Sequence, residues 1–217
     1  MITYPEVEDE AATVDELLKG ASIARLGDGE FKLIVGQGYV REPANPRLGK
    51  ELRNLVSRPA PGCIVGIPRL HAKGPKNGNW LARIDRFMPH LDEDMTYYSA
   101  FISRPDSAPW INRPKFARKM QKLWKDRKVA ALCEPKSSLL RMLSMGASHI
   151  EHIECPSESA YALIDLFEKA IVQSQPHIAF LACGPTATCL ANRLARRGVQ
   201  AIDFGSGGAF VARLLDE

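Results

Sequence analysis

The chain has 217 residues, of which 45% are hydrophobic and 25% charged, and its formal net charge is +4. This length suits one domain with a full core, so we expect residues 1–217 to form a single domain. The apolar runs fall short of the ~20 residues of a membrane span, and the acidic start lacks the basic residues of a signal peptide. The composition therefore argues against a membrane-spanning or secreted protein and predicts a cytoplasmic one.

Short apolar strands alternate with amphipathic helices in the first half of the chain. Thr13 and Glu16 have capping-box spacing, which predicts a short helix from residue 13 to about residue 19. A strand at 22–26 precedes a turn at 27–29. The elements predicted next are helices at 30–35 and 46–57, a strand at 63–67, a loop at 68–79, a helix at 80–87 and a strand at 96–101.

A basic segment opens the second half. Between residues 113 and 128, eight lysines and arginines are opposed only by Asp126. Pro114 suits a first helical turn, so the segment is predicted to be a helix with a basic face. Such a face is either a solvated surface or a contact for an anionic partner. The elements predicted after it are a strand at 129–133, a helix at 137–145, a strand at 150–153 and a long helix at 157–172.

The last third of the chain indicates the fold class. The continuous apolar run 177–183 is typical of a parallel strand buried on both faces. A helix at 184–197 and a strand at 199–204 complete a βαβ unit. We therefore predict an α/β protein with an open, mostly parallel, Rossmann-like sheet and helices on both faces. Such sheets bind ligands at the carboxyl ends of their strands.

Two acidic side chains follow the first predicted strand. Asp28 and Glu30 are separated by one glycine, and a tight turn can direct both carboxylates to one divalent cation. Magnesium and manganese prefer oxygen ligands and often take only one or two protein carboxylates, with phosphates and water filling the other positions. Asp-Gly is also a common turn pair, so the pattern alone is a weak signal.

A second candidate site lies where the strand at 177–183 meets its helix. Gly184 lets the backbone approach a ligand and Pro185 fits the first helical turn. Thr186 and Thr188 add hydroxyls near a helix N-terminus, which favours phosphate. The segment has neither P-loop nor G-x-G-x-x-G spacing, and a plain strand-to-helix turn is the alternative.

Three further polar residues follow predicted strands. Arg104 precedes Pro105 and could contact a phosphate through its guanidinium. Glu134 and Asp203 are candidate bases or metal-shell carboxylates, although either could equally cap a helix. The five cysteines are scattered without zinc-site or redox spacing and are expected to be buried, reduced thiols.

Taken together, these segments resemble the glycosyltransferases of the GT-D fold. The resemblance rests on five matches in chain order: Ile23-Ala-Arg-Leu-Gly-Asp-Gly-Glu-Phe-Lys-Leu-Ile34, Phe101-Ile-Ser-Arg-Pro105, Ile153-Glu-Cys-Pro-Ser157, Leu181-Ala-Cys-Gly-Pro-Thr-Ala-Thr188 and Gln200-Ala-Ile-Asp-Phe-Gly205. The sequence departs from the family after its last strand, where Gly205-Ser-Gly-Gly-Ala-Phe210 replaces a Gly-His-Ile-Asp segment. In the family, this segment bears on acceptor recognition and on the catalytic base, so these are the two properties that the departure affects.

The resemblance implies a nucleotide-sugar donor, usually a UDP-hexose, and a divalent cation, Mn²⁺ or Mg²⁺. It maps the family's metal and diphosphate motif onto Asp28 and Glu30. The base would be Glu134 or Asp203, and the acceptor a saccharide or a glycoconjugate. The other residues expected to contact the donor are Arg25, Gly27, Gly29, Arg104, Gly184, Pro185, Thr186 and Thr188.

Two alternatives stay open. The altered segment 205–210 is compatible with a nucleotide-binding module that has lost catalysis. The basic segment 113–128 and the lysines at 73 and 76 are compatible with DNA as acceptor, through hydroxymethylated bases. A dinucleotide-dependent oxidoreductase is disfavoured, since the glycine fingerprint is absent. The sequence does not predict an oligomeric state.

Overall fold

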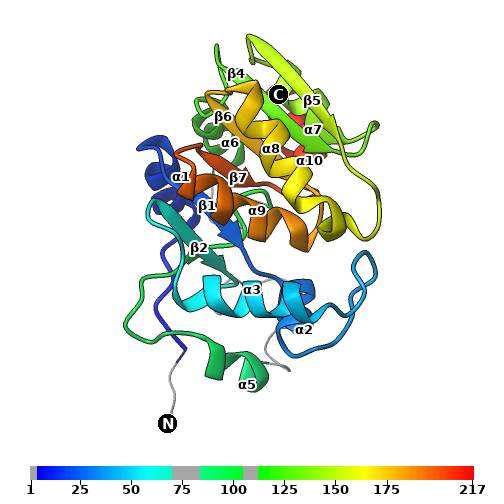
Figure 1. Cartoon of the computed structure of the whole chain (residues 1–217). Coiled ribbons are helices and arrows are strands. Elements are labelled where there is room, and N and C mark those ends of the chain that lie inside the picture. The colour runs from blue at the N-terminus through cyan, green and yellow to red at the C-terminus, as the bar shows by residue number, and fades with distance from the viewer. Residues whose placement is uncertain (1–3, 70–83, 105–111) are drawn as a thin grey trace.

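The computed structural model of the chain describes residues 4–69, 84–104 and 112–217. These residues contain seven strands: β1 (Ser22–Arg25), β2 (Cys63–Ile67), β3 (Tyr98–Ser99), β4 (Lys128–Cys133), β5 (His149–Glu154), β6 (Ile178–Ala182) and β7 (Ala201–Asp203). They form one sheet in the order β3-β2-β1-β7-β6-β4-β5, and every pair of neighbouring strands is parallel (Figure 1). The predicted parallel sheet is confirmed.

Helices cover both faces of this sheet. The layer in front of the sheet in Figure 1 consists of α3 (Pro46–Ser57), α8 (Ile164–Ser174) and α9 (Pro185–Arg196). The opposite layer consists of α1 (Glu10–Leu18), α6 (Arg113–Gln121), α7 (Ser138–Ser144) and α10 (Gly208–Asp216). Two shorter helices, α2 (Asp28–Ile34) and α5 (Ile84–Phe87), lie beside α3, and 3-10 turns span Met88–His90 and Ala160–Leu163.

The alternation of side chains along the central strands explains the two layers. On β4 and β6, Leu132 and Leu181 pack into the core beneath α3, α8 and α9. Their neighbours Ala131 and Phe180 pack into the core beneath α6, α7 and α10. Because successive strand residues point to opposite faces, a continuous apolar strand requires cover on both sides.

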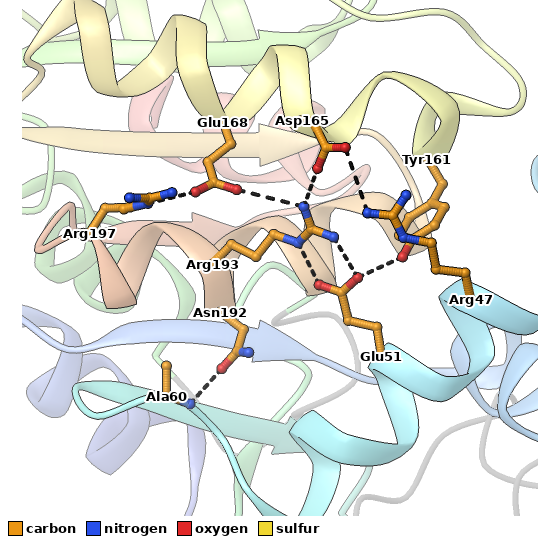
Figure 2. A network of polar contacts seen from close by, with 9 residues as sticks. All are labelled: Arg47, Glu51, Ala60, Tyr161, Asp165, Glu168, Asn192, Arg193 and Arg197. Atoms are coloured by element: carbon orange, nitrogen blue, oxygen red, sulfur yellow. Dashed lines mark hydrogen bonds and ion pairs between the residues drawn. The ribbon is translucent and has the colours of Figure 1, made fainter.

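A polar network joins the three helices of the front layer (Figure 2). Glu51 on α3 accepts hydrogen bonds from Nε and Nη2 of Arg193 on α9, at 2.6 and 2.8 Å. Arg193 Nη1 also donates to Asp165 on α8 at 2.6 Å, and the Tyr161 hydroxyl donates to Glu51 at 2.6 Å. One guanidinium therefore holds α3, α8 and α9 together above the apolar core.

The first helix begins earlier than its sequence pattern predicts. Asp9 is the N-cap of α1, and its carboxylate accepts the backbone N–H of Ala12 at 2.8 Å. Thr13 lies inside the helix, where its buried hydroxyl donates to the Asp9 carbonyl at 2.6 Å. The capping box expected from Thr13 and Glu16 is therefore wrong, because an earlier aspartate provides the cap.

Three predicted elements have different lengths. The helix expected at 157–172 is a 3-10 turn followed by α8, because Ser159 adopts a left-handed conformation with φ of 54°. The basic helix ends at Gln121, well short of residue 128, and Lys128 already belongs to β4. The strand expected at 96–101 is only Tyr98–Ser99.

Other expectations have mixed outcomes. All five cysteines are buried free thiols, as predicted. The helix α10 was not predicted at all. Most of the loop at 68–79 and the first part of the helix at 80–87 lie outside the described residues. Within the described part of the chain, no helix is both long enough and apolar enough to cross a membrane.

Candidate functional site

The candidate site lies at the carboxyl edge of the sheet, where the chain order reverses. From β1 the chain continues to β2 and β3 on one side, whereas β7 is reached from β6 on the other. Open α/β sheets bind ligands at such a switch point. A cavity of about 610 Å³, here called the large cavity, opens at this place. Its lining residues are Gly27, Asp28, Gly29, Glu30, Tyr39, Arg41, Glu134, Lys136, Ser137, Ser138, Ala182, Gly184, Pro185, Gly205 and Ser206.

The Asp-Gly-Glu segment forms the start of a helix. Asp28 and Gly29 belong to the first turn of α2, and Gly27 is its N-cap, so the turn expected at 27–29 is wrong. Glu30 Oε2 accepts the backbone N–H of Gly27 at 2.7 Å, which satisfies one unpaired donor of the helix start. The Tyr39 ring lies against Gly29, only 3.1 Å from where a side-chain Cβ would stand.

Both carboxylates of this segment line the large cavity. Asp28 also pairs with Lys32 one helical turn later, at 2.9 Å, and 40% of its side chain is exposed. Burial, together with the nearby negative charge of Asp203, raises the pKa of Glu30 from 4.5 to about 7. Glu30 is therefore the group in this segment whose charge changes near neutral pH.

The donor set suits a cation that is shared with a ligand. The described residues contain no group of three or more histidine, cysteine, aspartate or glutamate side chains able to hold a metal ion. Asp28 and Glu30 supply two carboxylates to one cavity, which is the number that Mg²⁺ takes when phosphates and water complete its shell. The residues fit a metal that arrives with a diphosphate and do not fit a closed protein-only site.

A smaller cavity of about 250 Å³, here called the small cavity, adjoins the large one. The residues that line both cavities are Gly27, Glu30, Gly184, Gly205 and Ser206. Arg25, Arg104 and Asp203 line the small cavity alone. Glu30 therefore stands between two adjoining spaces at the carboxyl edge.

Arg25 and Asp203 form a buried pair in the wall of the small cavity. The Arg25 guanidinium donates from Nη1 to the Ala100 carbonyl at 2.8 Å and to the Ser103 hydroxyl at 2.7 Å. Its Nε donates to the Asp203 carbonyl, and its Nη2 lies 3.6 Å from the Asp203 carboxylate. Burial raises the pKa of Asp203, and the positive charge of Arg25 opposes this effect. Both side chains are largely occupied by contacts within the protein.

The start of α9 divides into cavity residues and buried residues. Gly184 has φ of 61° and ψ of −146°, a conformation that is essentially open only to glycine, and Pro185 occupies the first turn as predicted. Both line the large cavity. Thr186 instead donates to Glu42 at 3.3 Å, and Thr188 donates to Asp203 at 2.9 Å. Both threonines are fully buried, and neither is among the described residues that line the two cavities.

Glu134 and Arg104 lie on different sides of the site. Glu134 follows β4, lines the large cavity and accepts a 2.5 Å ion-pair contact from Arg41 Nη1. Arg104 lines the small cavity, and its backbone N–H donates to the Phe101 carbonyl at 2.8 Å. The structure thus gathers all the predicted site residues at one edge, although the two threonines serve the interior.

The lining residues of the large cavity that were not among the predicted site residues are Tyr39, Arg41, Lys136, Ser137, Ser138, Ala182, Gly205 and Ser206. Tyr39 and Arg41 lie on the loop between α2 and α3, and the backbones of Tyr39 and Glu42 pair with each other at 2.7 and 3.0 Å. Periodicity carries no information on where such a loop returns to the sheet. A basic residue such as Arg41 in the loop that follows an acidic motif is too common in sequences to be singled out as a site residue.

Comparisons with known proteins consistently find glycosyltransferases. The family model for glycosyltransferases of the GT-D fold matches residues 23–207. A Streptococcus gordonii protein named a probable glycosyl transferase is 29% identical over 213 residues. A Streptococcus pneumoniae protein named glycosyltransferase GlyD is 24% identical over 210 residues. Each alignment covers 89% of this chain but only 30% and 26% of those proteins, so the chain spans less than a third of their length.

Solved structures agree with the family match. A structure described as a new glycosyltransferase from Streptococcus sanguinis has a TM-score of 0.79 at 25% identity, covering 92% of this chain and 81% of that one. A second structure, described as a domain of unknown function with a distinct glycosyltransferase fold, has a TM-score of 0.85 at 23% identity and covers 95% of this chain and 80% of that one. The latter likeness concerns the fold alone.

Proposed function

The chain belongs to the family of glycosyltransferases with the GT-D fold, and on that premise we propose that it transfers a hexose from a nucleotide-sugar to an acceptor hydroxyl. The proposed donor is a UDP-hexose, the proposed cation is Mn²⁺ or Mg²⁺, and the proposed acceptor is a saccharide or glycoconjugate. The observation that carries the proposal is that Asp28, Glu30 and the start of α9 line one cavity at the switch point. The names of the relatives support the same class of reaction.

The charges of the large cavity favour a cation-dependent donor. Its lining contains the carboxylates of Asp28, Glu30 and Glu134 but only two cationic side chains, those of Arg41 and Lys136. A diphosphate adds further negative charge and would be repelled without a neutralising ion. When bound, the divalent cation stabilises the charge that develops on the leaving diphosphate. Asp28 and Glu30 would hold this cation beside the donor phosphates.

Other residues of the chain would position the donor. Gly184 and Pro185 bring the positive end of the α9 dipole to the large cavity, and a helix N-terminus favours phosphate. Gly27 and Gly29 keep the α2 start close to the cavity. Because the Arg25 guanidinium is engaged by Asp203, Ala100 and Ser103, we assign it a structural and electrostatic role.

The acceptor and its base are assigned from the two adjoining cavities. Glu134 lies in the large cavity and is the proposed base, which takes the acceptor hydroxyl proton. The acceptor oxygen then bonds to the anomeric carbon, and the diphosphate leaves with the electron pair of the broken bond. Asp203 is the second candidate, although its carboxylate already accepts bonds from Arg25 and Thr188. Arg104 in the small cavity would contact the acceptor or a phosphate oxygen.

Isothermal titration of UDP, with and without Mn²⁺, tests the proposal. We expect binding to require the cation and to weaken at least about tenfold in Asp28→Asn, since a charged cation ligand is worth more than about 1.4 kcal/mol. Release of nucleotide from UDP-, GDP- and TDP-sugars then identifies the donor. Cation-independent binding, or unchanged binding in Asp28→Asn, would show that the site is wrongly assigned.

Two alternatives gain no separate support. The segment 205–210, which suggested a nucleotide-binding module without catalysis, forms the turn that starts α10. Slow hydrolysis of the donor without an acceptor would argue against such a module. For a DNA acceptor, no α6 residue is among the described residues that line the two cavities, and Lys119 is paired with Asp15 at 2.7 Å. The lysines at 73 and 76 lie outside the described residues.

A further inference from the structure

The loop between α2 and α3 folds back over the carboxyl edge and is anchored there. Glu42 is buried, and its carboxylate accepts hydrogen bonds from the Tyr161 N–H at 3.4 Å and the Thr186 hydroxyl at 3.3 Å. The Arg41 carbonyl accepts the Ser159 N–H at 2.9 Å. These contacts hold the backbone of residue 41 against the 3-10 turn and the start of α9. The Arg41 side chain is thereby fixed at its base and leads into the large cavity.

The Arg41 guanidinium pairs with Glu134, and both residues line the large cavity. Its Nη1 lies 2.5 Å from Glu134 Oε1, and the side chains are 53% and 39% exposed. Among the described residues, this ion pair is the one side-chain contact of the Arg41 guanidinium, whereas Arg25 uses three nitrogens on its neighbours. An exposed ion pair of this kind is weak, and most of the donors of the guanidinium fork remain for a second partner.

The geometry points to an exchange of partners, in which Arg41 leaves Glu134 and binds the diphosphate of the donor. We propose that this exchange makes Arg41 a donor-binding residue and makes Glu134 its competitor in the unliganded protein. The inference rests on the proposed function, because it assumes that a nucleoside diphosphate enters the large cavity. It adds a residue for which no motif of the sequence gave a signal.

Two physical arguments favour the exchange. A guanidinium recognises two phosphate oxygens at once through its planar fork, whereas Glu134 engages only one of its nitrogens here. A diphosphate also carries more negative charge than a single carboxylate. The exchange would in addition release Glu134 from its ion pair at the moment when the donor is in place, so that its carboxylate is available for an acceptor hydroxyl.

The test is the affinity for UDP of full-length variants in the presence of Mn²⁺, measured by isothermal titration. We expect Glu134→Gln to bind UDP about threefold to tenfold more tightly, because the competitor for Arg41 is removed. Arg41→Gln should bind at least about tenfold more weakly, because charge-assisted contacts to phosphate are lost. The double variant should resemble Arg41→Gln, since Glu134 has no competing effect once Arg41 is gone.

Matched variants control for charge alone. Glu93→Gln and Arg118→Gln remove one exposed charge of each sign outside both cavities and should leave UDP affinity unchanged. Thermal melts establish that each variant is folded. If the wild type binds UDP and Glu134→Gln binds it equally or more weakly, the exchange is wrong while the proposed function stands. If even the wild type does not bind UDP with Mn²⁺, the proposed function fails and the exchange fails with it.

Discussion

The carboxylate of Asp203 accepts a 3.1 Å hydrogen bond from the backbone N–H of Arg25, joining the last residues of the two central strands. The same carboxylate accepts the Thr188 hydroxyl at 2.9 Å. One acidic side chain thus connects β1, β7 and α9 directly beneath the candidate site. The contacts describe a residue that holds the edge of the sheet in place.

We therefore expect Asp203→Asn to act mainly on stability. The substitution leaves the Arg25 guanidinium without its charged partner, and breaking such a buried pair costs about 3–5 kcal/mol. Asp216→Asn is the control, because the Asp216–Arg141 pair is exposed at 50% and 71% and should contribute less than about 1 kcal/mol. Urea unfolding measures both. Unchanged stability with lost transfer activity would instead make Asp203 the catalytic base.

Glu30 makes the stability of the protein depend on pH. Its pKa is about 7 in the folded chain, against the ordinary glutamate value of 4.5, so the folded state keeps this proton to higher pH. The stabilising contribution is therefore present below about pH 4.5 and is lost as the pH rises through about 7. Glu30→Gln keeps an acceptor for the Gly27 N–H but does not titrate.

The difference in unfolding free energy between wild type and Glu30→Gln measures this effect. It should move in favour of the variant by at most about 3 kcal/mol between about pH 4.5 and pH 8. Because a cation requires the ionised carboxylate, Mn²⁺-dependent UDP binding by the wild type should strengthen over the same window. A stability difference that does not change with pH would contradict the raised pKa.

Arg193 is expected to matter more for stability than its neighbour Arg197. The Arg193 side chain is 18% exposed and bonds Glu51 twice and Asp165 once, whereas the Arg197 side chain is 65% exposed and bonds Glu168. Arg193→Met should lower the free energy of unfolding by about 2–3 kcal/mol, because Glu51 loses its charged partner in a partly buried place and keeps only the Tyr161 hydroxyl. Arg197→Met should cost less than about 1 kcal/mol. Equal effects in urea unfolding would show that the lower exposure and additional contacts of Arg193 add no stability.

Gly207 is expected to tolerate no side chain. A Cβ at this position would stand 2.1 Å from the Ser103 carbonyl oxygen and 2.5 Å from the Ser103 Cβ. Gly207→Ala should therefore destabilise the protein by about 1–3 kcal/mol, since the turn must move away from Ser103. Ala209→Ser, at an exposed position of the same turn, should change stability by less than about 0.5 kcal/mol. A neutral Gly207→Ala would show that the turn shifts freely.

The sequence predicted the core of the fold because its central strands are unambiguous. The apolar run containing Phe180 and the helix from Pro185 to Arg196 appear as expected. Helix ends that depend on a single capping contact or on one backbone conformation were predicted less well. Asp9 starts α1 before Thr13, and Ser159, in a left-handed conformation, delays a helix that the sequence pattern predicts from residue 157.

The candidate site was predicted as far as it follows strand ends. Asp28, Glu30, Gly184 and Glu134 all lie around one cavity, as their positions after strands imply. The interior roles of Thr186 and Thr188 could not be foreseen, because which side of a helix faces a ligand depends on tertiary packing. The loop residue Arg41 was missed for a different reason, since a loop has no period that fixes its path.

The position of β7 between β1 and β6 has a consequence for how the chain reaches its native state. The Ser22 hydroxyl in β1 accepts a hydrogen bond from the backbone N–H of Ala201 in β7, across a separation of 179 residues. During synthesis at ~5–20 residues per second, the first strand therefore waits roughly 10–35 s for its central neighbour. Throughout that time β1 exposes an open, apolar edge that can pair with other chains. Assembly of the sheet is completed from its middle, so slow translation or a shortened C-terminus would favour aggregation over native folding.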